Sequence, residues 1–195
     1  LIFVNITPNN FMMTTKRKIL VPIDFNERSV DMALSYAAKW AQRFSMDVDI
    51  LHVIEESGFF TKIFSGDKDE ELREQISQKL DEIAKATENE YHIRVNPMVT
   101  QGRIAPKINE TAKMLNPDII IMSSGNSYND EEEPSIGANT HRIVRITDFP
   151  VLIVRHPNYP KKLKNILVPI DLSTNSRIKI PDVANIAKKA NAVVT

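Results

Sequence analysis

The chain has no cysteine among its 195 residues. This excludes a disulfide framework, a thiol nucleophile and a cysteine-based zinc site. No apolar run reaches the 18–20 or so residues that a membrane-spanning helix needs. The opening Leu-Ile-Phe-Val stretch is too short for a signal peptide and has no basic leader. We therefore expect a cytoplasmic protein without membrane contact.

The chain also lacks an excess of charge, because 25 lysines and arginines balance 25 aspartates and glutamates. A general nucleic-acid binder would show a basic field, so that class is not expected. The four histidines show no metal-ligand spacing, and neither a P-loop nor a G-x-S-x-G motif is present. We expect no metal site, no catalytic residue and no enzymatic activity.

A repeat dominates what the chain does contain. KILVPIDFNERS at 18–29 and NILVPIDLSTNS at 165–176 are identical at seven of twelve positions. Their spacing is far above the period of solenoid repeats, so the repeat indicates a duplicated domain. We predict an N-terminal extension at 1–15, a domain at 16–156, a linker at 157–164 and the truncated start of a second domain at 165–195. Residues 1–13 have no period and are placed outside the fold.

Apolar strand patterns alternate with helical spacings along the first copy. Strands are predicted at 18–24, 47–54, 92–99, 118–124 and 150–155, with helices between them. Pro97 indicates an edge strand, and Asn26 or Ser29 is the expected cap of the first helix. The alternation predicts an α/β fold, a doubly wound, open parallel sheet with helices on both faces.

The carboxyl ends of the strands are where such sheets bind ligands. Asp24, Val53, Met122 and Ser123 fall at these ends. The Asp24 carboxylate either accepts hydrogen bonds from a ligand or caps the helix that follows it, and both readings stay open.

Four pieces in this order resemble the universal stress protein family over about 18–155: KILVPIDFNERS, ILHVI, DIIIMSSG and IGANTHRIVRITDFPVLIVR. The repeat resembles its tandem members. The resemblance implies a five-stranded parallel sheet of order 3-2-1-4-5, a role in stress survival and ATP as ligand. It places the nucleotide contacts at Pro22, Ile23, Asp24, Val53, Met122, Ser123, Gly125, Gly137, Ala138 and Asn139.

The phosphate loop departs from the family signature, which is Gly-x-x-Gly, nine residues, then Gly-Ser or Gly-Thr. Ser123 and Asn126 stand at the first two glycine positions, ten residues lead to Gly137, and Ala138 holds the Ser/Thr position. Gly125 is displaced by two positions. The loop therefore predicts a degraded phosphate site.

The acidic run DEEE at 130–133 precedes the fourth helix. Its carboxylates would repel phosphate unless magnesium bridges them. Two functions stay open: a regulatory module that binds ATP, with or without magnesium, and a scaffold that acts through domain pairing without a nucleotide. The apolar fifth strand, VLIV at 151–154, is expected to pair with a second copy or with the second domain as a pseudo-dimer.

Overall fold

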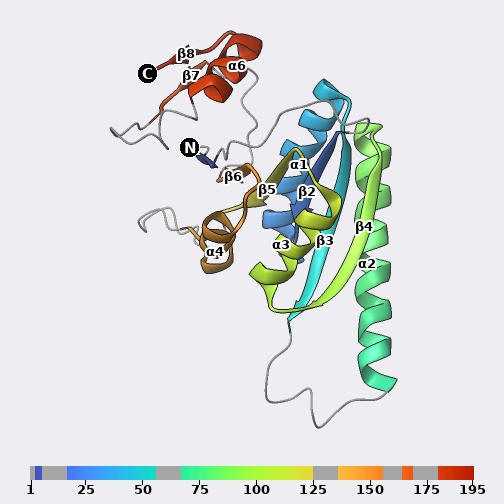
Figure 1. Cartoon of the computed structure of the whole chain (residues 1–195). Helices are drawn as coiled ribbons and strands as arrows, with labels where there is room; N and C mark the ends of the chain where they lie inside the picture. The colour runs from blue at the N-terminus through green and yellow to red at the C-terminus, as the bar shows by residue number, and fades with distance from the viewer. Residues whose placement is uncertain (1–2, 6–16, 56–66, 125–135, 156–163, 169–179) are drawn as a thin grey trace, which may run out of the picture.

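The computed structural model describes residues 3–5, 17–55, 67–124, 136–155, 164–168 and 180–195 (Figure 1). Its main sheet contains strands β1 (Phe3–Asn5), β2 (Lys18–Pro22), β3 (Asp47–Glu55), β4 (Val95–Gly102), β5 (Ile119–Ser123) and β6 (Val151–Val154). The helices are α1 (Glu27–Phe44), α2 (Asp67–Tyr91), α3 (Ile104–Leu115) and α4 (Ala138–Ile146).

The order of the strands is β1-β6-β5-β2-β3-β4. The five strands β2 to β6 run parallel, and their order along the chain is the predicted 3-2-1-4-5, which is confirmed. The chain leaves β2 toward β3 and β4 on one side and then fills the other side with β5 and β6. The switch point of the sheet therefore lies between β2 and β5.

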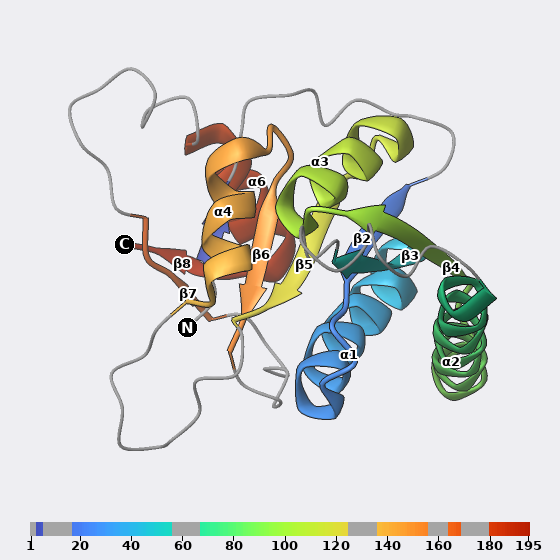
Figure 2. The ribbon, with the colours of Figure 1, turned by 90° about the horizontal axis from the view of Figure 1, so that it is seen from below.

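Helices cover the two faces of this sheet, as Figure 2 shows. Under α1 and α2 lies one core cluster, to which β2 contributes Ile19 and Val21 and β5 contributes Ile121. Under α3 and α4 lies a second cluster, with Leu20 from β2 and Met122 from β5. Strands β2, β5 and β6 are buried on both faces, which explains their continuous apolar runs.

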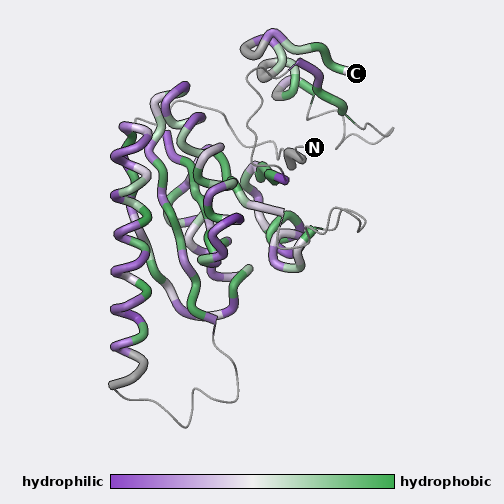
Figure 3. The backbone as a smooth tube through the Cα atoms, turned by 180° about the vertical axis from the view of Figure 1, so that it is seen from behind, coloured by the Kyte–Doolittle hydropathy of each residue, from purple (hydrophilic) through white to green (hydrophobic). Residues whose placement is uncertain are grey.

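Helix α2 is amphipathic, and its buried side chains among those described lie in its C-terminal half. Figure 3 shows it mainly hydrophilic with recurring hydrophobic positions. Leu80 and Ala84 are buried against the sheet, whereas Leu72 in the N-terminal half is 49% exposed. Burial of this narrow stripe, rather than an apolar surface all round, therefore fixes α2 on the sheet.

Strand β4 starts at Val95, three residues later than the predicted strand at 92–99, which was wrong at this end. His92 belongs to the end of α2: its N–H donates to the Glu88 carbonyl at 2.8 Å, and its φ of 52° is left-handed. The Glu88 carboxylate then accepts the N–H of Val95 at 2.8 Å. β4 is an edge strand, as the proline at position 97 predicted.

The opposite edge contains a strand that was not predicted. Phe3–Asn5 pair antiparallel with β6, although the sequence placed these residues outside the fold. Beyond the main sheet, β7 (Asn165–Ile166), α6 (Ile180–Ala190) and β8 (Val193–Val194) form a separate parallel two-stranded unit. Whether this unit begins a second domain stays a prediction.

Candidate functional site

Some of the predicted site residues at the switch point lie on the same face of the sheet. Val53 and Met122 belong to the core cluster under α3 and α4, and so does Leu20 of β2. Because side chains alternate along a strand, Pro22 follows Leu20 toward this same face, and Asp24 comes two residues after the end of β2. Ile23 does not share this face: its side chain lies in the opposite cluster, and its N–H donates to the Leu51 carbonyl at 2.9 Å. Ile23 thus offers a ligand no side chain on the α3 face.

Asp24 is exposed just beyond the last residue of β2. Its Oδ1 accepts the N–H of Asn26 at 3.1 Å. Asn26 in turn is the N-cap of α1, since its Oδ1 accepts the N–H of Ser29 at 3.1 Å. Asp24 therefore does not cap the helix. Among the residues that the structure describes, no lysine or arginine forms an ion pair with it, so its charge is open to a ligand.

Phe25 turns the chain between these two residues in a left-handed conformation, with a φ of 60°. A bulky side chain rarely adopts this region, so other contacts must hold it there. The Phe25 ring lies 4.3 Å from the ring of His52, centroid to centroid. The ammonium of Lys79 lies 5.1 Å from the Phe25 centroid. These contacts on the α1 and α2 face fix the direction in which Asp24 leaves the sheet.

His52 supports this turn from β3. Its Nδ1–H donates to the Ile23 carbonyl at 3.0 Å. Burial lowers the pKa of His52, and this outweighs the bond to Ile23 and the nearby charge of Asp24, both of which raise it. The imidazole is therefore held neutral and supports the turn.

The N-terminus of α4 meets the end of β5. Gly137 is the N-cap residue, and no side chain caps the helix. Its N–H donates to the Ser124 carbonyl at 2.7 Å, and the Thr140 hydroxyl donates to the Ser123 carbonyl at 3.1 Å. No acidic residue lies in the first turn. The N–H groups of Ala138 and Asn139 therefore have no carboxylate from that turn competing for them.

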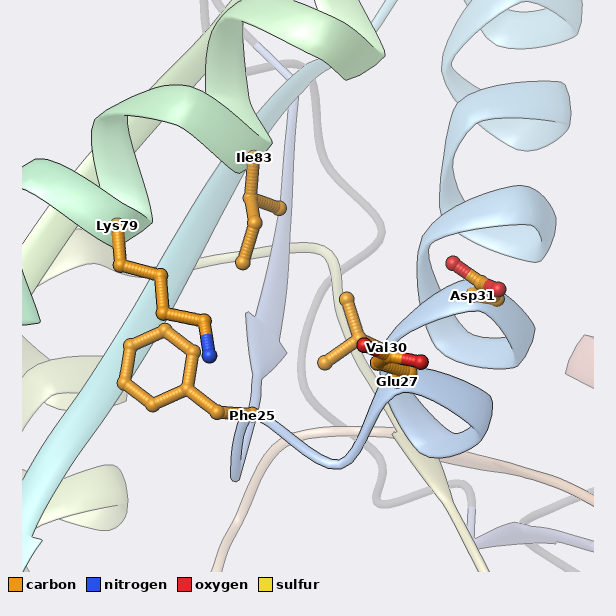
Figure 4. A pocket seen from close by; sticks show the side chains of 6 residues that line it. All are labelled: Phe25, Glu27, Val30, Asp31, Lys79 and Ile83. Carbon is orange, nitrogen blue, oxygen red and sulfur yellow. The ribbon is translucent and has the colours of Figure 1, made fainter.

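An open cavity of about 300 Å³ lies on the other face of the sheet (Figure 4). Val30 of α1 and Ile83 of α2 form its apolar walls, together with the Phe25 ring. Lys79, Glu27 and Asp31 add charge at its rim. None of the predicted nucleotide contacts lines this cavity. It is thus distinct from the switch-point site.

Some positions of the predicted phosphate loop lie outside the described residues. These are Gly125, Asn126 and the acidic run at 130–133. In the described part of the chain, no three His, Asp or Glu side chains gather as a metal site. There, too, no helix is both long and apolar enough to cross a membrane.

Sequence reasoning missed two residues that shape the site. Phe25 carries no signal, because left-handed turns are normally marked by glycine or asparagine. Thr140 could have been found, since it is a polar residue in the first turn of α4, a helix whose apolar residues Ile143 and Val144 pack on the sheet. Its hydroxyl anchors α4 to β5, and this fixes where the helix N-terminus points.

Comparisons with known proteins agree with this fold. The model of the universal stress protein family matches residues 16–155. The solved hypothetical protein MJ0577 is 28% identical, with a TM-score of 0.62 over 75% of this chain and 100% of its own. The hypothetical protein PH0823 is 30% identical, with a TM-score of 0.56 over 71% of this chain and 94% of its own.

A longer chain also matches in structure. It is a universal stress protein from Archaeoglobus fulgidus DSM 4304, 19% identical, with a TM-score of 0.72. The match covers 92% of this chain and 65% of that one, more than the range 16–155 alone can supply. No curated protein matches the sequence.

Proposed function

The chain belongs to the universal stress protein family, and we propose that its 16–155 domain binds an adenine nucleotide as a cytoplasmic regulatory module of the stress response, without a reaction of its own. The observation that carries this proposal is the exposed Asp24 carboxylate at the switch point. Its Oδ1 accepts the N–H of Asn26 within its own turn, and the neighbouring strands β3 and β5 bring apolar Val53 and Met122 to the same edge of the sheet. One carboxylate beside apolar side chains is a combination that suits a nucleoside.

The base and the ribose of the nucleotide would contact both the carboxylate and the apolar side chains. A carboxylate accepts hydrogen bonds from an exocyclic amino group or from ribose hydroxyls. Val53 and Met122 supply apolar contact for a purine face, and the polarizable thioether of Met122 suits an aromatic ring. Because Asp24 is exposed before any ligand arrives, binding does not have to break an existing ion pair.

The phosphate side relies on α4. Uncapped N–H groups and the helix dipole attract anions at a helix N-terminus. These N–H groups stand in for the glycine loop that the sequence lacks, and we expect weaker phosphate contact in consequence. In that case ATP binds only modestly better than AMP. Two universal stress proteins of the same fold support a compact nucleotide ligand: one, from Archaeoglobus fulgidus, was solved with dAMP and the other with cAMP.

Magnesium is expected to bind only together with the phosphates of the nucleotide. Its candidate ligands, the carboxylates at 130–133, lie outside the described residues. If they face the phosphates, Mg²⁺ will raise the affinity for ATP more than that for AMP.

The test is isothermal titration of the full chain with ATP, AMP and adenosine, with and without Mg²⁺. Asp24→Asn keeps an oxygen for the N–H of Asn26 and removes only the charge. A hydrogen bond to a charged group contributes about 1.5–3 kcal/mol, so we expect about 10- to 100-fold weaker binding. Asp31→Asn, an exposed carboxylate on α1, is the matched control and should bind as the unchanged chain does. Equal affinities of both variants would refute the role of Asp24.

A second variant separates ligand contact from folding. Asn139→Asp is isosteric and adds a negative charge to the first turn of α4. This charge should stabilise the helix by about 0.3–1 kcal/mol, yet repel phosphate. We expect ATP to bind less tightly with an unchanged affinity for adenosine and no loss in Tm. Absence of heat with any nucleotide up to millimolar concentrations would instead favour the scaffold.

A further inference from the structure

Strand β6 has one edge that faces away from β5. Ile120 donates its N–H to the Pro150 carbonyl at 2.8 Å, and Ser124 donates to the Val154 carbonyl at 2.9 Å. The polar groups of even-numbered β6 residues thus point to β5. Since these groups alternate sides along a strand, the N–H and C=O groups of Val151 and Ile153 point to the free edge. All four residues of β6 are buried.

Strand β1 occupies this edge. Phe3 lies opposite Ile153 and Asn5 opposite Val151, in antiparallel register. These two are the hydrogen-bonded pairs of the ladder, because they involve the β6 residues whose polar groups face outward. The intervening pair, Val4 and Leu152, is not hydrogen-bonded. Three residues of β1 therefore satisfy all four outward groups of Val151 and Ile153.

A second copy of β6 could satisfy the same groups. In an antiparallel pair with a two-fold axis at Leu152, Val151 of each copy faces Ile153 of the other. Both are then hydrogen-bonded pairs, two residues apart, with the spacing that Phe3 and Asn5 present. A two-fold interface of this kind is closed and self-complementary. Such a dimer and β1 require the same four backbone groups and exclude one another.

We propose that β1 is an intramolecular plug that occupies the β6 edge in place of a second copy of the chain. Pairing of this edge with a second copy is the expectation already drawn from the sequence, and the new element is that β1 closes the edge and that its release opens it. The balance is adjustable because β1 offers only two hydrogen-bonded residue pairs. Short, locally paired elements open at low free energy, without unfolding of the core. The inference depends on the strand register and not on the proposed nucleotide site.

The register supplies the test and its control. Phe3→Pro with Asn5→Pro removes both N–H groups that β1 directs at β6. Val4→Pro removes an N–H that points to the outer side, and proline is tolerated at such an edge position. Sedimentation velocity of the full chain is measured over a concentration series for all three proteins. We expect the double variant to dimerise at least about tenfold more tightly than the unchanged chain, which is about 1.4 kcal/mol, and Val4→Pro to match the unchanged chain.

Hydrogen exchange at Val151 and Ile153 locates the effect. Both amides should be protected in the unchanged chain at every concentration. In the double variant they should exchange fast when dilute and regain protection as the dimer forms. If they are equally unprotected in the unchanged chain, β1 does not occupy the edge and the proposal fails. The proposal is overturned if the double variant stays monomeric and its two amides stay unprotected at all concentrations. It is also overturned if Val4→Pro dimerises as tightly as the double variant.

Discussion

A buried carboxylate in the middle of the sheet offers a quantitative test of what holds the fold together. Asp49 of β3 is 2% exposed. Its Oδ1 accepts Nδ2–H of Asn96 at 2.7 Å. Its Oδ2 has no hydrogen bond but lies 3.6 Å from Nζ of Lys18, an ion pair at longer than hydrogen-bond distance. The charge of Asp49 therefore depends on Lys18 for much of its compensation.

The magnitude follows from distance and exposure. At 3.6 Å and an effective dielectric constant of about 20, the attraction is about 4–5 kcal/mol. The Lys18 side chain is 28% exposed, so water screens part of this. We expect Lys18→Met to lower the free energy of unfolding by about 2–3 kcal/mol, because a buried charge loses its partner. Asp49→Asn should cost less, since the amide can still accept from Asn96 and Lys18 can reach solvent.

Urea denaturation of both single variants and of the double variant measures the interaction free energy of Lys18 and Asp49 as a double-mutant cycle. Adding Asp49→Asn to Lys18→Met should restore stability, because the uncompensated charge disappears. Lys113→Met, an exposed lysine on α3, is the control, with an expected change within about 0.5 kcal/mol. The reasoning is refuted if Lys18→Met is no worse than this control, or if the double variant is less stable than Lys18→Met alone.

Three further predictions concern the turn, a glycine and α2. Folding lowers the pKa of His52, so the unfolded chain binds more protons than the folded chain once the pH falls to about 6.5 and below. The free energy of unfolding should therefore decrease as the pH drops through 6.5. His52→Phe should flatten this part of the pH profile of stability, measured by urea denaturation. Gly102 has a φ of 142°, and a Cβ there would lie 3.0 Å from Lys107 Cγ and Cε. Gly102→Ala should cost about 1–3 kcal/mol, and Lys107→Ala should rescue only part of it, because the backbone strain remains; full rescue would contradict this. Leu80→Ala should cost about 2–5 kcal/mol in thermal unfolding, against less than about 1 for exposed Leu72→Ala; equal costs would mean that α2 is not fixed by its buried stripe.

The sequence predicted the five-stranded core well, for a physical reason. Strands buried on both faces must be apolar throughout, and Lys18–Pro22 and Ile119–Ser123 stand out as such runs. Helix α3 was also predictable from the sequence. Pro106 falls in the first turn of the helix, where the missing N–H of a proline breaks no hydrogen bond. The strand order was predicted from the resemblance of several motifs, in their order along the chain, to a family. The pattern of a single strand does not predict the strand order.

What the sequence could not supply depends on contacts between distant residues. The start of β4 is decided by the left-handed His92 and by the bond from Val95 to Glu88. β1 has no period of its own, and its pairing depends on what β6 offers. At the site, the strand-end positions were predictable, whereas the conformation of Phe25 depends on its contacts with His52 and Lys79.

Strand β6 connects the plug with the proposed nucleotide site, and its hydrogen-bond alternation predicts how far the two influence each other. Its even-numbered residue Val154 accepts from Ser124, whose carbonyl accepts from Gly137 at the start of α4. The odd-numbered residues Val151 and Ile153 face β1. An exchange of β1 for a second copy thus leaves the bonds that position α4 unchanged.

We therefore expect the Phe3→Pro/Asn5→Pro protein to bind the same nucleotide with the affinity of the unchanged chain when both are titrated in the same calorimetric assay. A difference above about threefold, a coupling free energy of about 0.6 kcal/mol, would mean that β6 shifts as a whole when its edge changes partner. Val4→Pro serves again as the control, because it alters β1 without removing a bond to β6. Equal affinities in all three proteins would mean that the edge of β6 and the ligand site act independently. Nucleotide binding and dimerisation could then occur separately or together.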